Sequence, residues 1–333
     1  MGEVLSGAGT MKVEAQETLA ALRHALQAAA PEGERDDIAL AAFWLLQAEV
    51  LGLPEFGIRM LRRDLERLTH GPDASSTTDE AVTISSIDAT GVPGVVALAS
   101  AVHRASRGVE AHGLALIGIR GVGALGILGL AARSLAAQGS VALIAAQSPA
   151  SVAPWGARTA AIGTNPLAVG APRTDAPPLV VDYATSALTL AAVREARESG
   201  RSLPDGTAVD AAGQITTDPA SVAALLPTGL VGSLTGLVIE LLAGVAVGGR
   251  VTDSETPTGR GAVIIAFDPA RAGGTDAAAA ASALDRDWRA AGGHLPARFD
   301  VLATDPAQLP ASMDVDDDSV HWLRSRAEGH RGA

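Results

Sequence analysis

The chain has 333 residues, 47% of them hydrophobic, and a formal net charge of −12 at pH 7. This length allows one large or two modest globular domains, and the negative charge argues against binding to nucleic acid or to an anionic membrane surface. The absence of cysteine excludes disulfides, thiolate metal ligands and thiol nucleophiles. Small molecules are therefore the expected partners. The N-terminal segment lacks a basic start followed by an apolar core, which predicts a cytoplasmic protein.

The N-terminal part of the chain has the spacing of amphipathic helices. Apolar residues three and four apart predict helices over residues 14–30 and 36–68. We interpret residues 1–78 as an N-terminal helical region that ends in a polar linker at 71–80.

Residues 79–270 alternate between helical and strand patterns, which is typical of an α/β domain. The predicted helices are 95–111, 126–138, 188–199 and 237–247, and the predicted strands are 114–120, 141–145, 180–182 and 262–267. No internal repeat is evident.

The C-terminal segment, 271–333, begins with an alanine-rich helix predicted at 277–291 and is expected to pack back on the N-terminal part. The acidic run that starts at residue 314 indicates a solvated face or a frayed end rather than a metal site.

The apolar stretch 229–249 is long enough to span a membrane, but it contains Glu240 and six glycines. A charge placed at mid-membrane is costly. We therefore predict a buried helix here.

Gly121, Gly123 and Gly126 follow the predicted strand 114–120 with the spacing of a dinucleotide-binding fingerprint. That fingerprint also needs an acidic residue at the end of the next strand to bind the ribose, and Gln147 occupies this place. We favour turn and packing roles for the three glycines, with a true Rossmann dehydrogenase as the alternative.

A series of short motifs lies between residues 80 and 270. It consists of Ser148-Pro149, Pro154-Trp155-Gly156, Gly163-Thr164-Asn165-Pro166, Asp182-Tyr183-Ala184-Thr185-Ser186, Leu203-Pro204, Asp210 with Gly213, Thr216-Thr217-Asp218-Pro219, Glu240-Leu241-Leu242-Ala243-Gly244 and Ala266-Phe267-Asp268-Pro269. In order and spacing this series resembles the type 2 malate/L-lactate dehydrogenase family. The resemblance implies that family's own non-Rossmann, nicotinamide-binding α/β fold with an N-terminal helical region. It also implies a homodimer that acts on small 2-oxo acids, 2-hydroxy acids or cyclic imines.

The resemblance further implies that the α/β domain 79–270 holds the substrate and a site for NADPH or NADH. The residues that it assigns to cofactor binding are Gly126, Thr164, Asn165, Asp182, Ala184, Thr185 and Ser186. An asparagine offers a donor and an acceptor to an amide or a ribose, and hydroxyl groups can donate to phosphate oxygens. Each of these side chains could instead satisfy backbone groups in a structural turn.

The family's acid/base histidine aligns with Ala124, which cannot transfer a proton. The alignment uses Arg120, Gly126, Gly129 and Arg133. Proton transfer by a positioned acid typically contributes about a hundredfold or more in rate. Of the family's Ser-His-Gly-x-x-Arg motif only Gly57 remains, and two lysines that the family often carries are absent. The substituted positions are Glu55, Phe56, Met60, Ala192 and Val231.

Three other residues are candidates for catalysis. These are Asp182, Tyr183, whose phenol could donate a proton or simply pack, and Arg59, which lies one position from the lost arginine and could reach a carboxylate. The histidines do not have the spacing of zinc ligands, so no metal is predicted.

Two functions remain open. The first is a divergent NAD(P)H-dependent oxidoreductase that acts on a cyclic imine or a 2-oxo acid derivative in a biosynthetic pathway. An iminium is already protonated, so its reduction needs no acid. The second is a family member repurposed for a non-redox biosynthetic step or for binding without catalysis, because several contacts are lost together.

Overall fold

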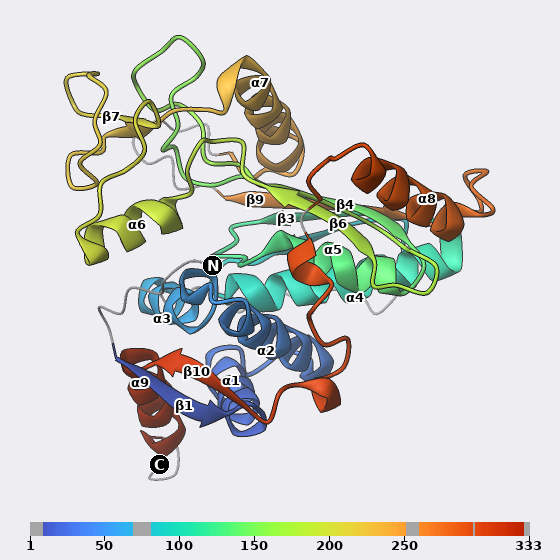
Figure 1. The fold of residues 1–333 in the computed structure, drawn as a ribbon. Helices are drawn as coiled ribbons and strands as arrows, with labels where there is room; N and C mark the ends of the chain where they lie inside the picture. Colours follow the sequence, from blue (N-terminus) through green and yellow to red (C-terminus); the bar gives the residue numbers. More distant parts are fainter. Residues whose placement is uncertain (1–8, 69–80, 251–259, 296, 330–333) are drawn as a thin grey trace.

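The computed structural model describes residues 9–68, 81–250, 260–295 and 297–329. Helices and strands alternate through the middle of the chain, which confirms the predicted α/β class. Figure 1 shows a central sheet with one layer of helices beneath it and, at the bottom, a further helical layer beside a separate pair of strands. The linker predicted at 71–80 lies outside the described residues.

A mixed sheet forms the centre of the fold, and within the described residues its strand order is β2-β3-β9-β4-β5-β6. The strands are β2 Ile84–Asp88, β3 Leu114–Arg120, β9 Gly261–Phe267, β4 Val141–Ala146, β5 Leu167–Ala171 and β6 Leu179–Tyr183. Strands β2 and β3 are parallel, and the remaining neighbours are antiparallel. The middle strands are rich in Val, Ile, Leu and Ala, as expected for strands covered on both faces.

Two helices, α4 (Gly94–His112) and α5 (Leu128–Ala137), cover one face of the sheet (Figure 1). Their inward positions carry small residues such as Ala101 and Ala131, which let the helices approach the strands closely. Helix α4 ends at Gly113, whose φ of 81° is the left-handed conformation that commonly ends a helix.

The N-terminal helices pack beneath this layer and consist of α1 Ala15–Ala29, α2 Arg35–Val50, the 3₁₀ turn η1 Pro54–Phe56 and α3 Ile58–Arg67. Helix α2 is buried on nearly every face because it lies between α1 and α4. This arrangement places α3 next to the turn that follows β3, where Asp64 of α3 accepts a hydrogen bond from the Ala124 N–H.

The segment from residue 314 is not a frayed end, although part of its acidic run forms the solvated face that was the other predicted possibility. Strand β10 (Ser312–Asp316) pairs antiparallel with β1 (Thr10–Glu14), and helix α9 (Asp317–Gly329) packs on α1. The sequence alternates here, so Val315 points into the core while Asp314 points to solvent. Asp314 on β10 and Asp318 in the first turn of α9 are exposed, whereas Asp316 is buried.

Between β6 and β9 the chain forms a smaller lobe with helix α6 (Leu190–Ser199), the hairpin β7 (Ala208–Val209) and β8 (Ala224–Leu225), and helix α7 (Gly229–Ile239), which continues as a π-helix, η2 (Glu240–Val245). Helix α8 (Ala277–Ala290) and the 3₁₀ turns η3 (Ala297–Phe299) and η4 (Pro306–Gln308) follow β9.

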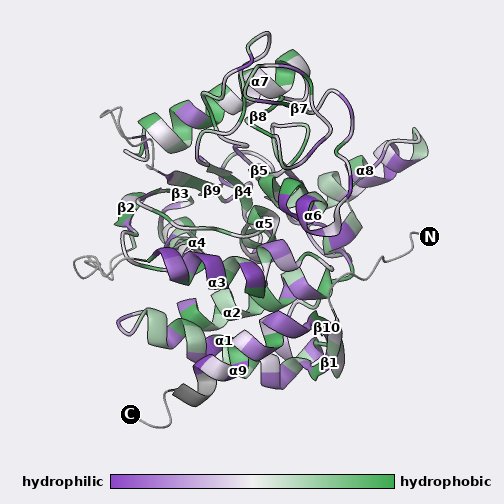
Figure 2. Ribbon diagram, turned by 90° about the vertical axis from the view of Figure 1, so that its left-hand side faces the viewer, coloured by the Kyte–Doolittle hydropathy of each residue, from purple (hydrophilic) through white to green (hydrophobic). Residues whose placement is uncertain are grey.

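The prediction of a buried helix at 229–249 is also wrong. The small residues of α7 face the protein, where a Cβ on Gly232 would lie 2.7 Å from the Thr185 carbonyl oxygen and one on Gly236 would lie 2.8 Å from Ile162 Cδ1. The large apolar residues of α7 are exposed, and the helix lies at the upper rim of the molecule in Figure 2. These exposed residues are Leu230, Val231, Leu234, Leu237, Val238, Leu241 and Val245. Among the described segments, no helix meets the length and hydropathy needed to cross a bilayer.

Candidate active site

A cavity of about 640 Å³ lies where the N-terminal helices, the turn after β3, strand β6 and helix α6 meet. Five of the predicted site residues line it: Gly126, Thr164, Asp182, Tyr183 and Ala184. Ala124 lines it as well, together with Phe56 and Met60 from the N-terminal region. Several of the residues that the resemblance assigns to the site therefore line one cavity, although not all of them do.

Asn165 is fully buried and does not line the cavity. Its φ of 38° is left-handed, a conformation that asparagine tolerates better than most residues. The side-chain oxygen accepts the Ser148 N–H at 3.0 Å, while the amide nitrogen donates to the Gly236 carbonyl and to Glu240 Oε1 at 2.9 Å. These contacts fix the 163–166 turn against α7, so the side chain holds the cavity wall rather than facing a ligand.

The hydroxyl groups of Thr185 and Ser186 are also used inside the protein. Thr185 Oγ1 donates to the Thr164 carbonyl at 3.0 Å, and Ser186 Oγ donates to the Leu188 carbonyl at 2.6 Å. Both residues are buried outside the cavity lining. They shape the loop between β6 and α6, as the structural alternative in the sequence analysis allowed.

Arg59 points away from the cavity into a cluster of carboxylates. It lies 3.0 Å from Glu198 Oε2 and 3.3 Å from Asp316 Oδ2. Because these partners take up the guanidinium, Arg59 links α3 to α6 and β10 and is not placed to bind a substrate.

Asp182 is the titratable predicted residue with the most unusual surroundings. Burial raises the pKa of its carboxyl above the ordinary range, and the Arg298 charge and the Gly129 N–H only partly offset this effect. Asp182 Oδ2 accepts hydrogen bonds from Gly129 N–H at 3.1 Å and from Arg298 Nη2 at 3.2 Å. The cavity therefore holds a carboxyl group that keeps its proton to a higher pH than a solvated aspartate.

The glycine turn after β3 packs against protein groups, as predicted. A Cβ on Gly123 would lie 2.5 Å from the Asp64 carboxylate, and one on Gly121 would collide with Thr90 Oγ1. Gln147 donates to Glu240 at 2.9 Å in the interior, where it cannot bind a ribose. Strand β9 lies antiparallel between β3 and β4, so this is not the parallel strand-helix-strand unit of a Rossmann domain. The Rossmann alternative is wrong.

Among the described residues, five arginines line the cavity, and none of them is marked by a sequence motif. They are Arg63, Arg67, Arg194, Arg260 and Arg298. They come from four segments far apart in sequence, so their clustering cannot be seen in the sequence. The formal net charge of −12 also gives no indication of a local positive site. Burial and the nearby charge of Arg67 lower the pKa of Arg260, although Asp64 acts in the opposite direction. The cavity therefore favours an anionic ligand.

Glu55 organises two of these arginines from behind the cavity wall. Its buried carboxylate accepts from Arg194 Nε at 2.7 Å and from Arg63 Nη1 at 3.2 Å, and Arg63 Nη2 lies 3.1 Å from Oε2 as an ion pair. Burial alone would raise the pKa of Glu55, but the hydrogen bond from Arg194 and the two positive charges lower it. Glu55 is therefore a carboxylate at neutral pH.

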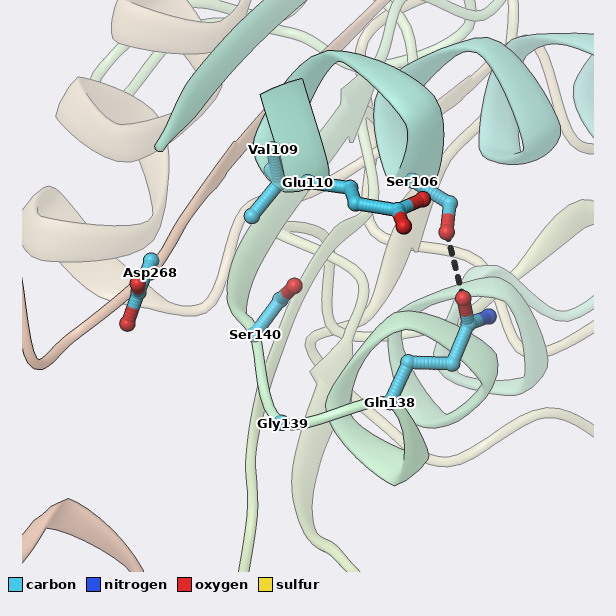
Figure 3. A pocket seen from close by; sticks show the side chains of 7 residues that line it. All are labelled: Ser106, Val109, Glu110, Gln138, Gly139, Ser140 and Asp268. Carbon is cyan, nitrogen blue, oxygen red and sulfur yellow. Dashed lines mark hydrogen bonds between the residues drawn. The ribbon is translucent and has the colours of Figure 1, made fainter. Parts of the chain in front are cut away.

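A second hollow of about 400 Å³ lies between α4 and the turn after α5 (Figure 3). Ser106 and Gln138 hydrogen-bond across it, and Glu110 and Asp268 are its charged groups within the described residues. It contains none of the predicted site residues, and its negative charge does not suit an anionic ligand. Among the described residues, no cluster of three or more His, Asp or Glu side chains is arranged to hold a metal ion.

Comparison with known proteins identifies relatives in both sequence and fold. The family model described as malate/L-lactate dehydrogenase matches residues 13–293. A (2R)-3-sulfolactate dehydrogenase (NADP(+)) from Chromohalobacter salexigens is 33% identical over 68% of this chain and 72% of its own length. A Δ1-pyrroline-2-carboxylate/Δ1-piperideine-2-carboxylate reductase from Pseudomonas putida is 34% identical over 61% of this chain and 63% of its own, just under two thirds. The crystal structure of the Δ1-piperideine-2-carboxylate reductase from Pseudomonas syringae matches with a TM-score of 0.80 and 28% identity, covering 95% of this chain and 100% of that one.

Proposed function

The chain belongs to the malate/L-lactate dehydrogenase family, and on that premise we propose that it is an oxidoreductase that transfers a hydride between a nicotinamide cofactor and a small acid substrate. One observation carries the proposal. Asp182, a carboxyl group with a raised pKa, lines a cavity that also gathers five arginines among the described residues of an acidic chain.

The cavity residues fit a nicotinamide cofactor. Arginine side chains complement phosphate groups, and Thr164 presents a hydroxyl that is 3.0 Å from Ser148 Oγ at the same wall. NADPH is the expected cofactor, because the name of the sulfolactate dehydrogenase relative specifies NADP(+) and the local positive charge suits an additional phosphate.

In this proposal the cofactor supplies the hydride when bound, and the protein controls the proton. The Asp182 carboxyl donates its proton to the carbonyl oxygen of a 2-oxo acid as negative charge develops there. The Gly129 N–H and Arg298 fix Oδ2, which orients the carboxyl and stabilises the carboxylate that remains after the transfer. Ala124 has no titratable group, so Asp182 takes the acid role that the resemblance assigns to a histidine.

The proposed substrate is a small 2-oxo acid or a cyclic imine that carries a carboxylate. One of the relatives is named as a sulfolactate dehydrogenase and another as a reductase of cyclic imine carboxylates. Sulfolactate and the cyclic imine carboxylates all combine a carbon that can be oxidised or reduced with an acid group. A cyclic iminium arrives protonated, so its reduction depends less on an acid in the cavity.

Titration with reduced cofactor tests the proposal. We expect NADPH fluorescence to change on binding, with saturation well below millimolar concentration, and a weaker response to NADH. Absence of binding by either cofactor at millimolar concentration would overturn the proposal and favour the alternative.

That alternative is a family member repurposed for a non-redox biosynthetic step or for binding alone. The observation in its favour is that Ala124, Phe56 and Met60, which line the cavity, cannot exchange protons. A small acid that binds the cavity without any nicotinamide requirement would support it.

A homodimer is part of the same proposal. The exposed face of α7 contains no charged residue over Gly229–Ile239, so a second copy can pack on it without charge repulsion. Monomeric proteins rarely expose apolar patches larger than a few hundred Å². A twofold axis brings identical patches together, and the apolar residues of α7 would then be buried.

A further inference from the structure

Arg194 has a free guanidinium edge at the cavity. It lies on α6, and its Nε donates to Glu55 Oε2 at 2.7 Å. Within the described residues, its two terminal nitrogens have no hydrogen-bond partner in the protein, although the side chain lines the cavity. Four N–H donors of this planar group are therefore available to a ligand.

Glu55 holds Arg194 in a fixed orientation. Its carboxylate is only 6% exposed and is bound on its other side by Arg63. Arg63 also donates to the Glu55 backbone carbonyl at 3.1 Å, so it holds both the side chain and the backbone of Glu55. Arg63 therefore fixes the position of Glu55, and Glu55 fixes the orientation of Arg194. The terminal nitrogens of Arg194 remain free to bind a ligand.

The terminal nitrogens of a guanidinium match two oxygens of one oxyanion, and a guanidinium fixed before binding loses little entropy when it forms such a pair. We propose that Arg194, oriented by Glu55, is the residue that binds an oxyanion group of the ligand in this cavity, a carboxylate, a sulfonate or a phosphate. This inference rests on the proposed function for the identity of the ligands but can be tested by binding alone.

Two matched ligand pairs identify the source of the oxyanion. Δ1-Pyrroline-2-carboxylate and 1-pyrroline differ by one carboxylate, and NADPH and NADH differ by one phosphate. Calorimetric titration of the full chain gives the preference of each variant for the member of each pair that carries the additional carboxylate or phosphate. We expect Arg194→Ala to reduce this preference about 10- to 100-fold in one pair, the loss typical of a bidentate charge-assisted contact.

The affected pair names the source of the oxyanion. Loss in the imine pair assigns Arg194 to the substrate, and loss in the cofactor pair assigns it to the phosphate. An unchanged preference in both pairs would overturn the inference, and so would a wild-type protein without preference in either. Failure of the proposed function is a different result, namely no binding of either nicotinamide, and the imine pair still decides the role of Arg194 in that case.

Matched variants separate binding from folding. Arg197→Ala changes an arginine on the same helix that lies outside the cavity and donates to the Pro219 carbonyl, so it should leave both preferences unchanged. Arg194→Lys keeps the positive charge but loses the planar pair of N–H groups that can bind two oxygens at once, and an intermediate preference is expected. Glu55→Gln keeps an acceptor without the charge and should retain part of the preference that Glu55→Ala loses. Equal effects of these two changes, with unaltered thermal midpoints, would show that Glu55 does not position Arg194.

Discussion

The backbone N–H of Ala124 donates to Asp64 Oδ1 at 2.9 Å, a contact between α3 and a turn sixty residues later in the chain. Asp64 Oδ2 accepts the Gly94 N–H at the start of α4, also at 2.9 Å. One buried carboxylate therefore fixes the cavity turn and the first turn of a core helix. The N-terminal helices are part of the site architecture for this reason.

Replacement of Asp64 tests that link. Asp64→Ala leaves two buried N–H groups without an acceptor, and each costs roughly 1–3 kcal/mol. We expect the free energy of unfolding to fall by roughly 2–6 kcal/mol in urea titrations. Asp205→Ala, at an exposed position, is the control and should change stability little. A loss no larger than that of the control would show that the two hydrogen bonds are not important.

Glu49 predicts a pH dependence of stability. Burial, partly offset by the hydrogen bond from the Ile58 N–H at 2.7 Å, raises the pKa of Glu49 from 4.5 to about 7. Between these two values the folded protein binds a proton that the unfolded chain has already released, so stability falls as pH rises through this window. The slope is at most about 1.4 kcal/mol per pH unit.

Glu49→Gln removes this titration while keeping an oxygen that can accept from Ile58. We expect unfolding free energies measured between pH 5 and pH 7 to decline less steeply in the variant than in the wild type. Other buried acids such as Asp182 are common to both proteins and cancel in the comparison. Parallel curves for the two proteins would contradict a raised Glu49 pKa.

The apolar face of α7 predicts an oligomer. Val231 and Leu234 are among its exposed residues, and glutamate at either position would place a charge in the proposed contact between two copies. We expect the wild type to elute as a dimer in light-scattering chromatography and Val231→Glu with Leu234→Glu to elute as a monomer. Leu284→Glu, on the exposed side of α8, should leave the dimer intact. A monomeric wild type would contradict the proposed dimer.

Ala124→His tests whether the missing histidine is the only functional difference between this cavity and the family pattern. The alanine lines the cavity, but Phe56 and Met60, which also line it, stand where the family carries a second histidine and an arginine, and the single change restores neither of them. We therefore expect the variant to gain no reduction of pyruvate over the wild type in a steady-state assay. Appearance of this activity from the single change would mean that only one contact separates the chain from an ordinary 2-oxo acid reductase.

The regular parts of the fold were predictable because their residues carry strong local signals. The strand 114–120 and the helix at 95–111 follow from apolar runs and helical spacing, and the structure has β3 and α4 there. Strands β2 and β5 were missed, since Ile84–Asp88 is half polar and Leu167–Ala171 is short and rich in small residues. Their strand state depends on pairing with β3 and β4.

The site was predictable only in part, because a motif gives the position of a residue and not the direction of its side chain. Thr164 and Asp182 face the cavity, whereas Asn165, from the same turn as Thr164, is used by Glu240. Arg194 carried no local signal at all, since its importance depends on Glu55, which is 139 residues away in the chain. Helix α7 was misjudged because its apolar side chains face outward and its glycines face inward, an orientation that hydrophobicity alone does not reveal.

The central claim, an oxidoreductase in which Asp182 supplies the proton, is tested most directly by single-turnover hydride transfer from bound NADPH. The substrates are pyruvate and Δ1-pyrroline-2-carboxylate, compared between the wild type and Asp182→Asn over a range of pH. We predict that bound NADPH is oxidised when Δ1-pyrroline-2-carboxylate is added, whether or not pyruvate also reacts. Any ketone reduction should slow as pH rises through the raised pKa of Asp182 and fall about 10²- to 10⁴-fold in the variant, because asparagine cannot donate that proton. The protonated imine should lose much less. No NADPH oxidation by either substrate, or equal rates in the wild type and the variant on both, would contradict the claim.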